Sequence, residues 1–394
     1  MWMDVEFGRP ARSLWSLQED ARFLNHGSFG ACPLVVQGEQ DRIRAEMERQ
    51  PDEFIYANVT PKAEAVTPLR TVAGQIGEFV GVAGDSIAII ENATIGIQSV
   101  LNSLALTPGD EVLITDHQYN AVRLAVEFRC REIGAAPRVA AIPLPASADE
   151  VRASIREAAG PRVRLAIIDH ITSPTALVFP IAEIIADLHE RGVRVLVDGA
   201  HAIGHIPLDL GDLGADWYVS NLHKWLYAPK GSALLYASNR AREITRPAIT
   251  SHFVEMGFPK AFDYLGTRDY SGWLAIPTAI AFFNRLGRER LWRHNARLIA
   301  VVSEQLERLG ARPAGPPEMC AAMRAFILPQ RREARQEDAL DLKRALWEEA
   351  RIQVNTATLA GALLIRISAQ AYVDEADMLA LGAQLERSGW PGRG

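Results

Sequence analysis

Short apolar runs alternate with segments of helical periodicity between about Ser86 and Ser238. The runs have the length expected of buried strands, and the segments between them place apolar residues three and four positions apart. The predicted strands are 86–90, 111–115, 138–143, 164–169, 193–197, 217–220 and 232–236, and the predicted helices are 95–106, 121–133, 149–159 and 181–191. This alternation predicts an α/β core on a mostly parallel sheet of seven strands.

The pattern changes after about Ser271. Residues 273–309 predict one or two long helices, and prolines and a glycine at 313–317 then interrupt the chain. Beyond them, strands are predicted at 321–328 and 363–368 and helices at 337–350 and 374–387. We therefore predict an N-terminal arm and helix (1–50), a large α/β domain (51–275), and a long interdomain helix with a small α+β domain (276–394).

Composition narrows the class of protein. The 394 residues are 48% hydrophobic and 23% charged, as in globular proteins, and the net charge of -6 without a basic block argues against nucleic-acid binding. No apolar run approaches the roughly 18 residues of a membrane span. The N-terminus lacks the apolar core of a signal peptide, and three scattered cysteines fit a reducing compartment. We therefore expect a cytoplasmic protein.

Two charged residues follow predicted strands. Asp198 lies in the run Val195-Leu-Val-Asp-Gly-Ala-His201, and Lys224 lies 23 residues after His201 in Ser220-Asn-Leu-His-Lys-Trp225. Both would face the crevice at the carboxyl ends of the strands. A buried carboxylate needs a cation such as a cofactor pyridinium, and a lysine with a lowered pKa can form a Schiff base with a cofactor aldehyde. The pair indicates pyridoxal 5′-phosphate (PLP).

Two further features fit the same crevice. Asn92-Ala-Thr94 opens a predicted helix, where the backbone of Ala93 and Thr94 and the Thr94 hydroxyl could bind phosphate. Asn92 or Thr94 could equally be a simple helix cap. His117 follows the strand at 111–115 and could stack on a flat ring, although a lone histidine is more often structural. It is the combination with Asp198 and Lys224 that favours a PLP site.

These motifs resemble the class V aminotransferase family of fold-type I PLP enzymes, and within it the isopenicillin N epimerase-like branch. The resemblance is carried by Phe23-Leu-Asn-His-Gly-Ser-Phe-Gly30, Asp198-Gly-Ala-His201, Ser220-Asn-Leu-His-Lys-Trp225 and Gly266-Thr-Arg-Asp269, and it runs from about residue 23 to 387. It implies an enzyme that acts at the α-carbon of an amino acid and forms a homodimer.

The resemblance also implies roles for single residues. Lys224 would form the Schiff base, Asp198 would keep the pyridine nitrogen protonated, His201 would bond the phenolic oxygen, and His117 would stack on the ring. The phosphate would be held by Ala93, Thr94, Ser220, Asn221, His223 and, from the second subunit, Thr267. Arg366 would bind the substrate carboxylate, with Asn25 and His26 lining the substrate pocket. Ser173 stands where family desulfurases have an asparagine near the cofactor, so its role stays open.

Three reactions are compatible with this site once Lys224 has taken the α-proton. Reprotonation from the opposite face gives an epimer and needs a second acid, such as His117 or Tyr119, or a mobile lysine. Loss of a β-substituent gives a carbon–sulfur lyase for cysteine conjugates or sulfoxides, and protonation of the cofactor gives an aminotransferase. An amino-acid epimerase or racemase is the first expectation, because the opening and lysine motifs look most like that branch.

A persulfide-forming cysteine desulfurase is not expected. Such enzymes in this family carry a nucleophilic cysteine on a loop shortly before the carboxylate arginine. No cysteine lies between Ala321 and Arg366, and Cys320 precedes Arg366 by 46 residues.

Three other functional classes fit the sequence less well than a PLP enzyme does. Asp198, His201 and His205 could ligate zinc on a helix, but Gly204 and Pro207 oppose a helix there, so no metal is predicted. A nicotinamide site lacks the Gly-x-Gly-x-x-Gly motif, since the glycines at 77, 81 and 84 have the wrong spacing. A non-catalytic binding protein would not need Lys224 together with Asp198, His201 and His223.

Overall fold

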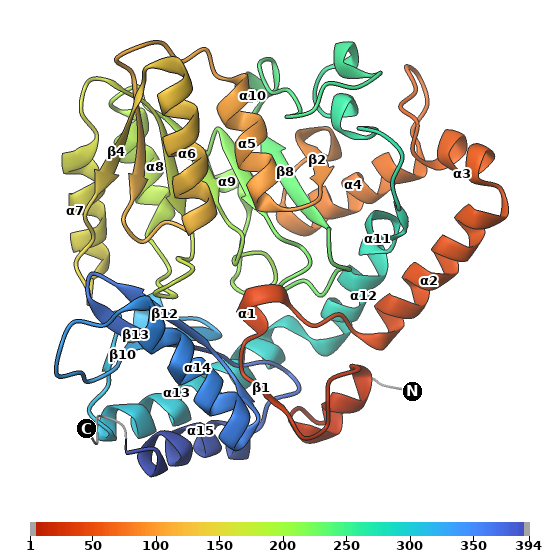
Figure 1. The fold of residues 1–394 in the computed structure, drawn as a ribbon. Coiled ribbons are helices and arrows are strands. Elements are labelled where there is room, and N and C mark those ends of the chain that lie inside the picture. Colours follow the sequence, from red (N-terminus) through yellow and green to blue (C-terminus); the bar gives the residue numbers. More distant parts are fainter. Residues whose placement is uncertain (1–4, 390–394) are drawn as a thin grey trace.

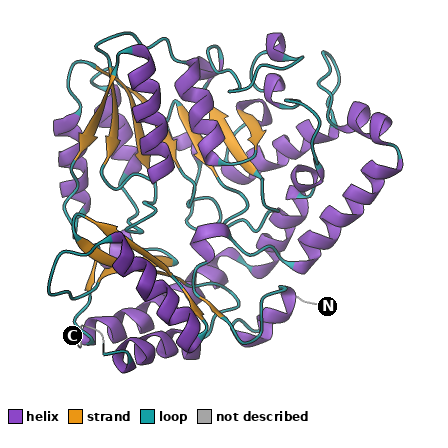
Figure 2. Cartoon of the chain, viewed as in Figure 1, coloured by secondary structure: helices purple, strands orange, loops and turns teal. Residues whose placement is uncertain are grey.

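The computed structural model describes residues 5–389 and has a seven-stranded sheet at its centre (Figures 1 and 2). Its strands are β2 (Ile87–Ile90), β3 (Glu111–Thr115), β4 (Ala136–Ala140), β5 (Val163–Asp169), β6 (Arg194–Asp198), β7 (Trp217–Ser220) and β8 (Ala233–Ala237), in the order β2-β8-β7-β6-β5-β3-β4. All neighbours are parallel except β8, which is antiparallel to β2 and β7. The predicted α/β class with a mostly parallel seven-stranded sheet is confirmed.

Helices cover both faces of this sheet, which explains why its strands are continuously apolar. In β5, Ala166 and Ile168 join the core on one face, while Leu165 and Ile167 join the core on the other. The helices are α4 (Pro68–Val80), α5 (Ala93–Ser103), α6 (Asn120–Ile133), α7 (Ala148–Ala158), α8 (Ile181–His189), α9 (Leu210–Leu213) and α10 (Asn239–Arg242). The edge strand β4 ends before the predicted residue 143, because the Ile142 amide donates to the Asp116 carboxylate.

A second, antiparallel sheet has the order β12-β13-β10-β9 and lies below the first in Figure 1. Its strands are β9 (Arg312–Pro313), β10 (Met323–Ile327), β12 (Asn355–Leu359) and β13 (Ala362–Ser368), and the helices around it are α13 (Arg288–Arg308), α14 (Gln336–Ala350) and α15 (Glu375–Arg387). Instead of one or two helices, residues 273–309 form the end of α11 (Ser271–Leu274), α12 (Ile276–Leu286) and α13, with a break at Gly287, whose φ is 80°.

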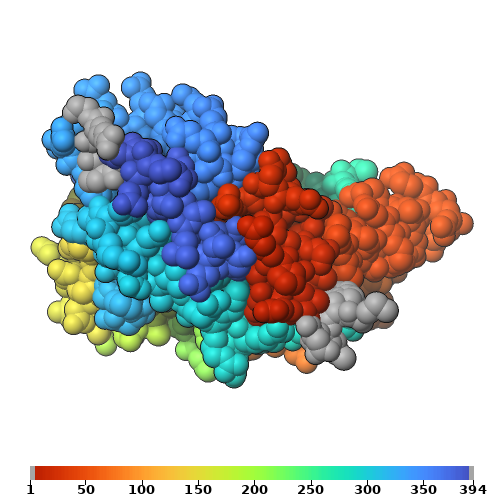
Figure 3. All heavy atoms as spheres, turned by 90° about the horizontal axis from the view of Figure 1, so that it is seen from below, coloured from red at the N-terminus to blue at the C-terminus, as the bar shows by residue number. Residues whose placement is uncertain are grey.

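The N-terminal arm lies against the C-terminal part of the chain (Figure 3). Strand β1 (Arg22–Phe23) pairs in parallel with β11 (Ile352–Gln353), and α1 (His26–Phe29) then lies between the two sheets (Figure 1). The predicted N-terminal helix is present as α2 (Leu34–Arg49), followed by α3 (Pro51–Asn58). The domain boundaries at residues 50 and 275 remain a prediction, and residues 1–4 and 390–394 of the outer parts lie outside the described residues. Within residues 5–389, no helix is long and apolar enough to cross a membrane.

Candidate active site

The carboxyl ends of β6 and β7 bring Asp198 and Lys224 into one buried site. Asp198 is the last residue of β6 and is 3% exposed, and its Oδ1 accepts a hydrogen bond of 3.0 Å from the Ala200 amide. Lys224 follows β7 by four residues, and its Nζ lies 3.2 Å from His201 Nε2. The Ala200 amide engages Oδ1, so Oδ2 is the oxygen that could accept from a cofactor ring nitrogen.

The surroundings of Lys224 favour a neutral amine. Burial, aided by the charge of Arg366 and opposed by Asp198 and Asp169, lowers the pKa of Lys224 from 10.5 to about 7. A large fraction of the amine is then unprotonated near neutral pH, as a nucleophile or base requires. Burial also lowers the pKa of His201 well below 6.5, so His201 is neutral beside the amine.

Asp169 is a buried acid of this site that the sequence reading missed. It ends β5, pairs with Asp198 across the sheet, and its Oδ2 is buried without a hydrogen-bond partner within residues 5–389. Burial, with the charge of Asp198, raises the pKa of Asp169 well above 3.8. The signal was available, because Asp169 ends an apolar predicted strand in the same way as Asp198.

The N-terminus of α5 faces the loop that follows β7 and carries Lys224, which we call the lysine loop. The Asn92 side chain caps this helix by accepting from the Ile95 amide at 3.0 Å, and the Ala93 amide donates to Asn221 Oδ1 at 2.9 Å. Thr94 is exposed at this helix end. The Ala93 and Ile95 amides are thereby occupied, which leaves Thr94 and the positive end of the helix dipole to attract an anion.

Ser220 and His223, both expected to bind the phosphate, differ in whether they still have a polar atom available for it. The Ser220 hydroxyl already donates to the Gly199 carbonyl at 2.6 Å, so it has no proton left for a phosphate oxygen. His223 Nδ1 lies 2.9 Å from the Ser232 carbonyl, which leaves Nε2 for a ligand. Burial, with the charge of Lys224, lowers the pKa of His223 to about 4.

His117 and Tyr119 lie in different environments. His117 is 1% exposed, and its Nδ1 lies 2.9 Å from the Thr175 hydroxyl. Burial lowers the pKa of His117, although Asp116 and a backbone hydrogen bond to Ile142 act in the opposite direction. Tyr119 is 49% exposed just before α6, so the structure does not bring it into the buried site.

Arg366 is a buried cation without a carboxylate partner. It lies on β13, is 2% exposed, and burial lowers its pKa to about 10. Its Nη1 donates to the Ser173 carbonyl, and its Nη2 donates to Ser28 Oγ at 2.9 Å and to Asn25 Oδ1 at 3.5 Å. Its Nε is buried and has no partner within residues 5–389. A buried guanidinium held only by neutral groups is suited to bind an anionic ligand.

His26 supports the lysine loop from behind. Its Nε2 lies 3.0 Å from the Lys224 carbonyl and its Nδ1 lies 2.8 Å from the Tyr372 hydroxyl, so both ring nitrogens are occupied. Gly30 ends the same segment with a φ of 67°, and a Cβ there would lie 2.1 Å from the His223 carbonyl oxygen. The segment therefore packs directly on the backbone of the lysine loop.

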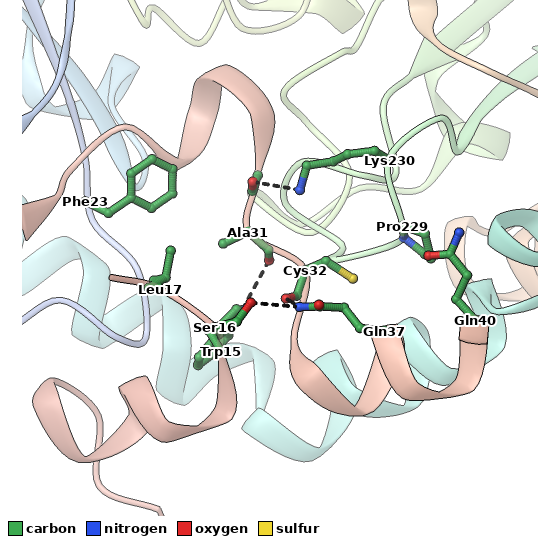
Figure 4. Close-up of a pocket in the computed structure, with 11 residues that line it drawn as sticks. Trp15, Ser16, Leu17, Phe23, Ala31, Cys32, Gln37, Gln40, Pro229 and Lys230 are labelled. Atoms are coloured by element: carbon green, nitrogen blue, oxygen red, sulfur yellow. Dashed lines mark hydrogen bonds between the residues drawn. The ribbon is translucent and has the colours of Figure 1, made fainter. Parts of the chain in front are cut away.

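A cavity of about 430 Å³ lies on the other side of this segment (Figure 4). Three side chains on its walls hold three consecutive carbonyls: Lys230 donates to Gly30, Trp15 to Ala31 and Gln37 to Cys32. None of the predicted site residues lines this cavity. Its walls thus fix the segment that carries Asn25, His26 and Ser28.

Thr267, the residue expected to reach the phosphate of a second subunit, lies apart from the buried site. Thr267 is exposed, next to Arg268, which pairs with Glu91 and lies 4.1 Å from the Trp273 ring centre.

The arrangement of His205 does not suit the alternative of a zinc site. Its Nδ1 bonds the His201 carbonyl at 2.9 Å and its Nε2 accepts from the Ala322 amide at 2.8 Å, so both ring nitrogens are occupied. Residues 5–389 contain no group of three His, Cys, Asp or Glu side chains that could hold a metal ion.

The family model for class V aminotransferases matches residues 48–377, which is most of the chain. The chain belongs to the class V aminotransferase family. It is therefore a PLP-dependent enzyme, and the cofactor and enzyme class expected from the sequence are confirmed.

Relatives within this family have different named activities. An L-cysteine desulfhydrase of Arabidopsis thaliana is 32% identical over 352 residues, covering 84% of this chain and 76% of the relative. An isopenicillin N epimerase of Streptomyces clavuligerus is 31% identical over 410 residues, covering 98% of this chain and 99% of the relative. The structure of a C-DES variant with glycine covalently linked to PLP has a TM-score of 0.79 at 23% identity, covering 95% of this chain and 98% of that chain, and shows the same fold.

Proposed function

We propose that this enzyme is a β-eliminating carbon–sulfur lyase that acts on L-cysteine or an S-substituted cysteine. One observation supports this choice of reaction: the surroundings of His117 and Tyr119 do not favour either side chain as the second acid of an epimerase. His117 is neutral with Nδ1 occupied by Thr175, and Tyr119 is half-exposed outside the site. Elimination needs one base, while inversion at Cα needs an acid on the opposite face.

Each residue of the site would have its own role in holding the cofactor. PLP, when bound, supplies an electron sink for the charge released at the α-carbon. Lys224 would hold the cofactor aldehyde, and Asp198 would accept from the ring nitrogen and keep it protonated. The free Nε2 of His223 and Thr94 at the α5 N-terminus would hold the phosphate. His201 would bond the phenolic oxygen, and His117 would cover the ring face opposite Lys224.

Arg366 would orient the substrate through its α-carboxylate. Its Nε has no partner within residues 5–389, and the 3.5 Å bond from Nη2 to Asn25 is long, so Nε and Nη2 could together donate to a carboxylate from one side of the guanidinium. Ser28 and Asn25 hold Nη2, and Ser173 holds Nη1, so the fork has a fixed orientation. The neutral Lys224 amine would then take the α-proton and return a proton to the departing sulfur. The overall products would be pyruvate, ammonia and a thiol, with one water consumed.

Epimerisation is the second candidate, because the match to the isopenicillin N epimerase spans nearly the full length of both chains. We also propose that the enzyme does not form a persulfide on a cysteine of its own. Burial raises the pKa of Cys320 to about 11, and its thiol contacts the carbonyls of Ala321 and Met323. Such a thiol is a poor nucleophile at neutral pH.

A single assay separates the two candidates. The holoenzyme is incubated in D₂O with L-cysteine, an S-alkyl cysteine and an amino acid that lacks a β-leaving group. We expect pyruvate and thiol or sulfide in equal amounts from the first two, and α-deuterium with retained configuration in the third. Accumulation of the D-enantiomer without pyruvate would overturn the lyase proposal in favour of the epimerase.

We also propose a homodimer in which Thr267 reaches the partner's phosphate site. Thr267 is exposed on a loop that the Arg268–Glu91 pair anchors close to the start of α5. A symmetric dimer would place two such loops reciprocally.

A further inference from the structure

The turn at residues 172–177 connects two parts of the active site. The Thr172 amide donates to the Leu177 carbonyl at 3.0 Å, and the Leu177 amide donates back to Thr172 Oγ1 at 2.8 Å. Ser173 on this turn accepts from Arg366, and Thr175 contacts His117. The motif Thr172-Ser-Pro-Thr175 therefore touches both the carboxylate-binding arginine and the histidine assigned to the ring face.

The hydroxyl groups of the turn form a chain of hydrogen bonds with a preferred direction. Thr172 Oγ1 accepts from the Leu177 amide and lies 2.7 Å from Thr175 Oγ1, but 3.5 Å from the Leu177 carbonyl. Its proton is therefore better placed on Thr175 than on Leu177, because hydrogen bonds weaken at the longer distance. Thr175 must then donate its own proton to His117 Nδ1, 2.9 Å away.

A proton on Nε2 of His117 is consistent with this direction of the hydrogen bonds. A neutral imidazole carries one proton, so an accepting Nδ1 leaves that proton on Nε2. An interaction with the Ile142 backbone acts to raise the pKa of His117, which is the effect expected of a ring N–H that faces a carbonyl. Thr172, Thr175 and His117 are all essentially inaccessible to solvent, so water does not compete for these positions.

We propose that Thr175 is a positioning residue that fixes His117 in its Nε2–H tautomer and in one ring plane. The proposal rests on the proposed function only in assigning His117 to the cofactor ring. In this state the ring offers the cofactor a flat neutral face and offers the substrate neither a proton nor a lone pair. The Thr175 hydroxyl thereby restricts proton transfer at the α-carbon to the Lys224 side.

The tautomer can be measured directly without turnover. Protein labelled with ¹⁵N-histidine is compared by long-range ¹H–¹⁵N spectra as apoenzyme and holoenzyme, with His117 assigned from a His117→Asn variant. We expect an unprotonated Nδ1 and a protonated Nε2 in the wild type. Thr175→Val, which keeps the shape and removes the hydroxyl, should give a mixture of tautomers, whereas Thr175→Ser should restore the wild-type pattern. A protonated Nδ1 in the wild type overturns the proposal without any variant.

Cofactor absorbance separates this proposal from the proposed function. In Thr175→Val holoenzyme, the pH midpoint of the visible absorbance of bound PLP should move, and Thr175→Ser should reverse the change. A changed tautomer with unchanged absorbance would confirm the role of Thr175 and contradict the placement of His117 on the ring. An unchanged tautomer in Thr175→Val would overturn the role of Thr175, whatever the absorbance does.

Discussion

Asp169 and Asp198 end neighbouring parallel strands and are direct partners in the sheet register. Both carboxyl groups are buried, at 2% and 3% exposure. Burial raises both pKa values, and the charge of Asp198 raises that of Asp169 further. We infer that Asp169 holds a proton while Asp198, which accepts from the Ala200 amide, keeps the negative charge that a protonated ring nitrogen needs.

This difference predicts unequal effects of replacing the two acids. Asp169→Asn should keep kcat within about tenfold, because an amide is close in shape and charge to a protonated acid. Asp198→Asn should lower kcat by about 10² to 10³, as expected when a group that stabilises developing charge is lost. Steady-state kinetics at matched PLP content would test this, and equal losses in the two variants would contradict it.

The pKa of Lys224 predicts the pH dependence of cofactor attachment. A lysine whose pKa is lowered to about 7 is mostly protonated below that pH and mostly neutral above it. The rate at which apoenzyme captures PLP covalently should therefore rise through about pH 7 and level off above it. Arg366→Met removes a cation that lowers this pKa, so its profile should move to higher pH. Stopped-flow absorbance would measure both profiles, and a midpoint near 10 in the wild type would refute the assignment.

Arg366 should control substrate affinity more than its neighbours do. Truncation to Met would leave a buried carboxylate unpaired, which costs about 2 to 5 kcal/mol, or at least about 30-fold in KM. Ser28→Ala removes only one hydrogen bond to Nη2 and should raise KM by less than about tenfold. Initial rates with L-cysteine and with an amine lacking the carboxylate provide the test. If Arg366→Met weakened both substrates equally, Arg366 would not be the carboxylate site.

Alanine substitution of Gly30 tests the close packing behind Lys224, and the same substitution of Gly38 is its control. Gly30→Ala should destabilise the protein by about 2 kcal/mol or more, because φ is positive and the new methyl group would strike the His223 carbonyl. Gly38→Ala on α2 meets nothing within 4 Å and should add about 0.5 to 1 kcal/mol of helix stability. Urea unfolding measures both, and borohydride trapping of PLP would show whether Lys224 is displaced in Gly30→Ala. Equal stabilities would contradict the close packing.

Subunit complementation tests the proposed dimer. Lys224→Ala and Thr267→Val homodimers should each be impaired. A mixed dimer would contain one site with the intact Lys224 of one subunit and the intact Thr267 of the other, so mixing should restore about one active site per dimer. Light scattering gives the oligomeric state. Failure of a confirmed mixed dimer to regain activity would place Thr267 at the site of its own subunit.

The sequence was most informative where local patterns determine position. Asp198 and Lys224 follow strands of a parallel sheet, so topology alone brings them together, and the Asn92 cap could be predicted from the helix start. Contacts between distant segments could not be predicted. Thr175 with His117, Ser28 with Arg366 and the β1–β11 pair depend on tertiary packing, and short strands such as β1 have no periodicity to recognise. The bond from the Ser220 hydroxyl to the Gly199 carbonyl is another such tertiary contact.

The pairing of Arg22 with Ile352 has a consequence for synthesis of the protein. Ser28 and Asn25, which orient Arg366, leave the ribosome 338 and 341 residues before it. The arm has no β11 to pair with until Ile352 and Gln353 have been translated. The anion-binding fork can thus be completed only after Arg366 itself has been synthesised, and chains that stop before residue 366 would lack it altogether.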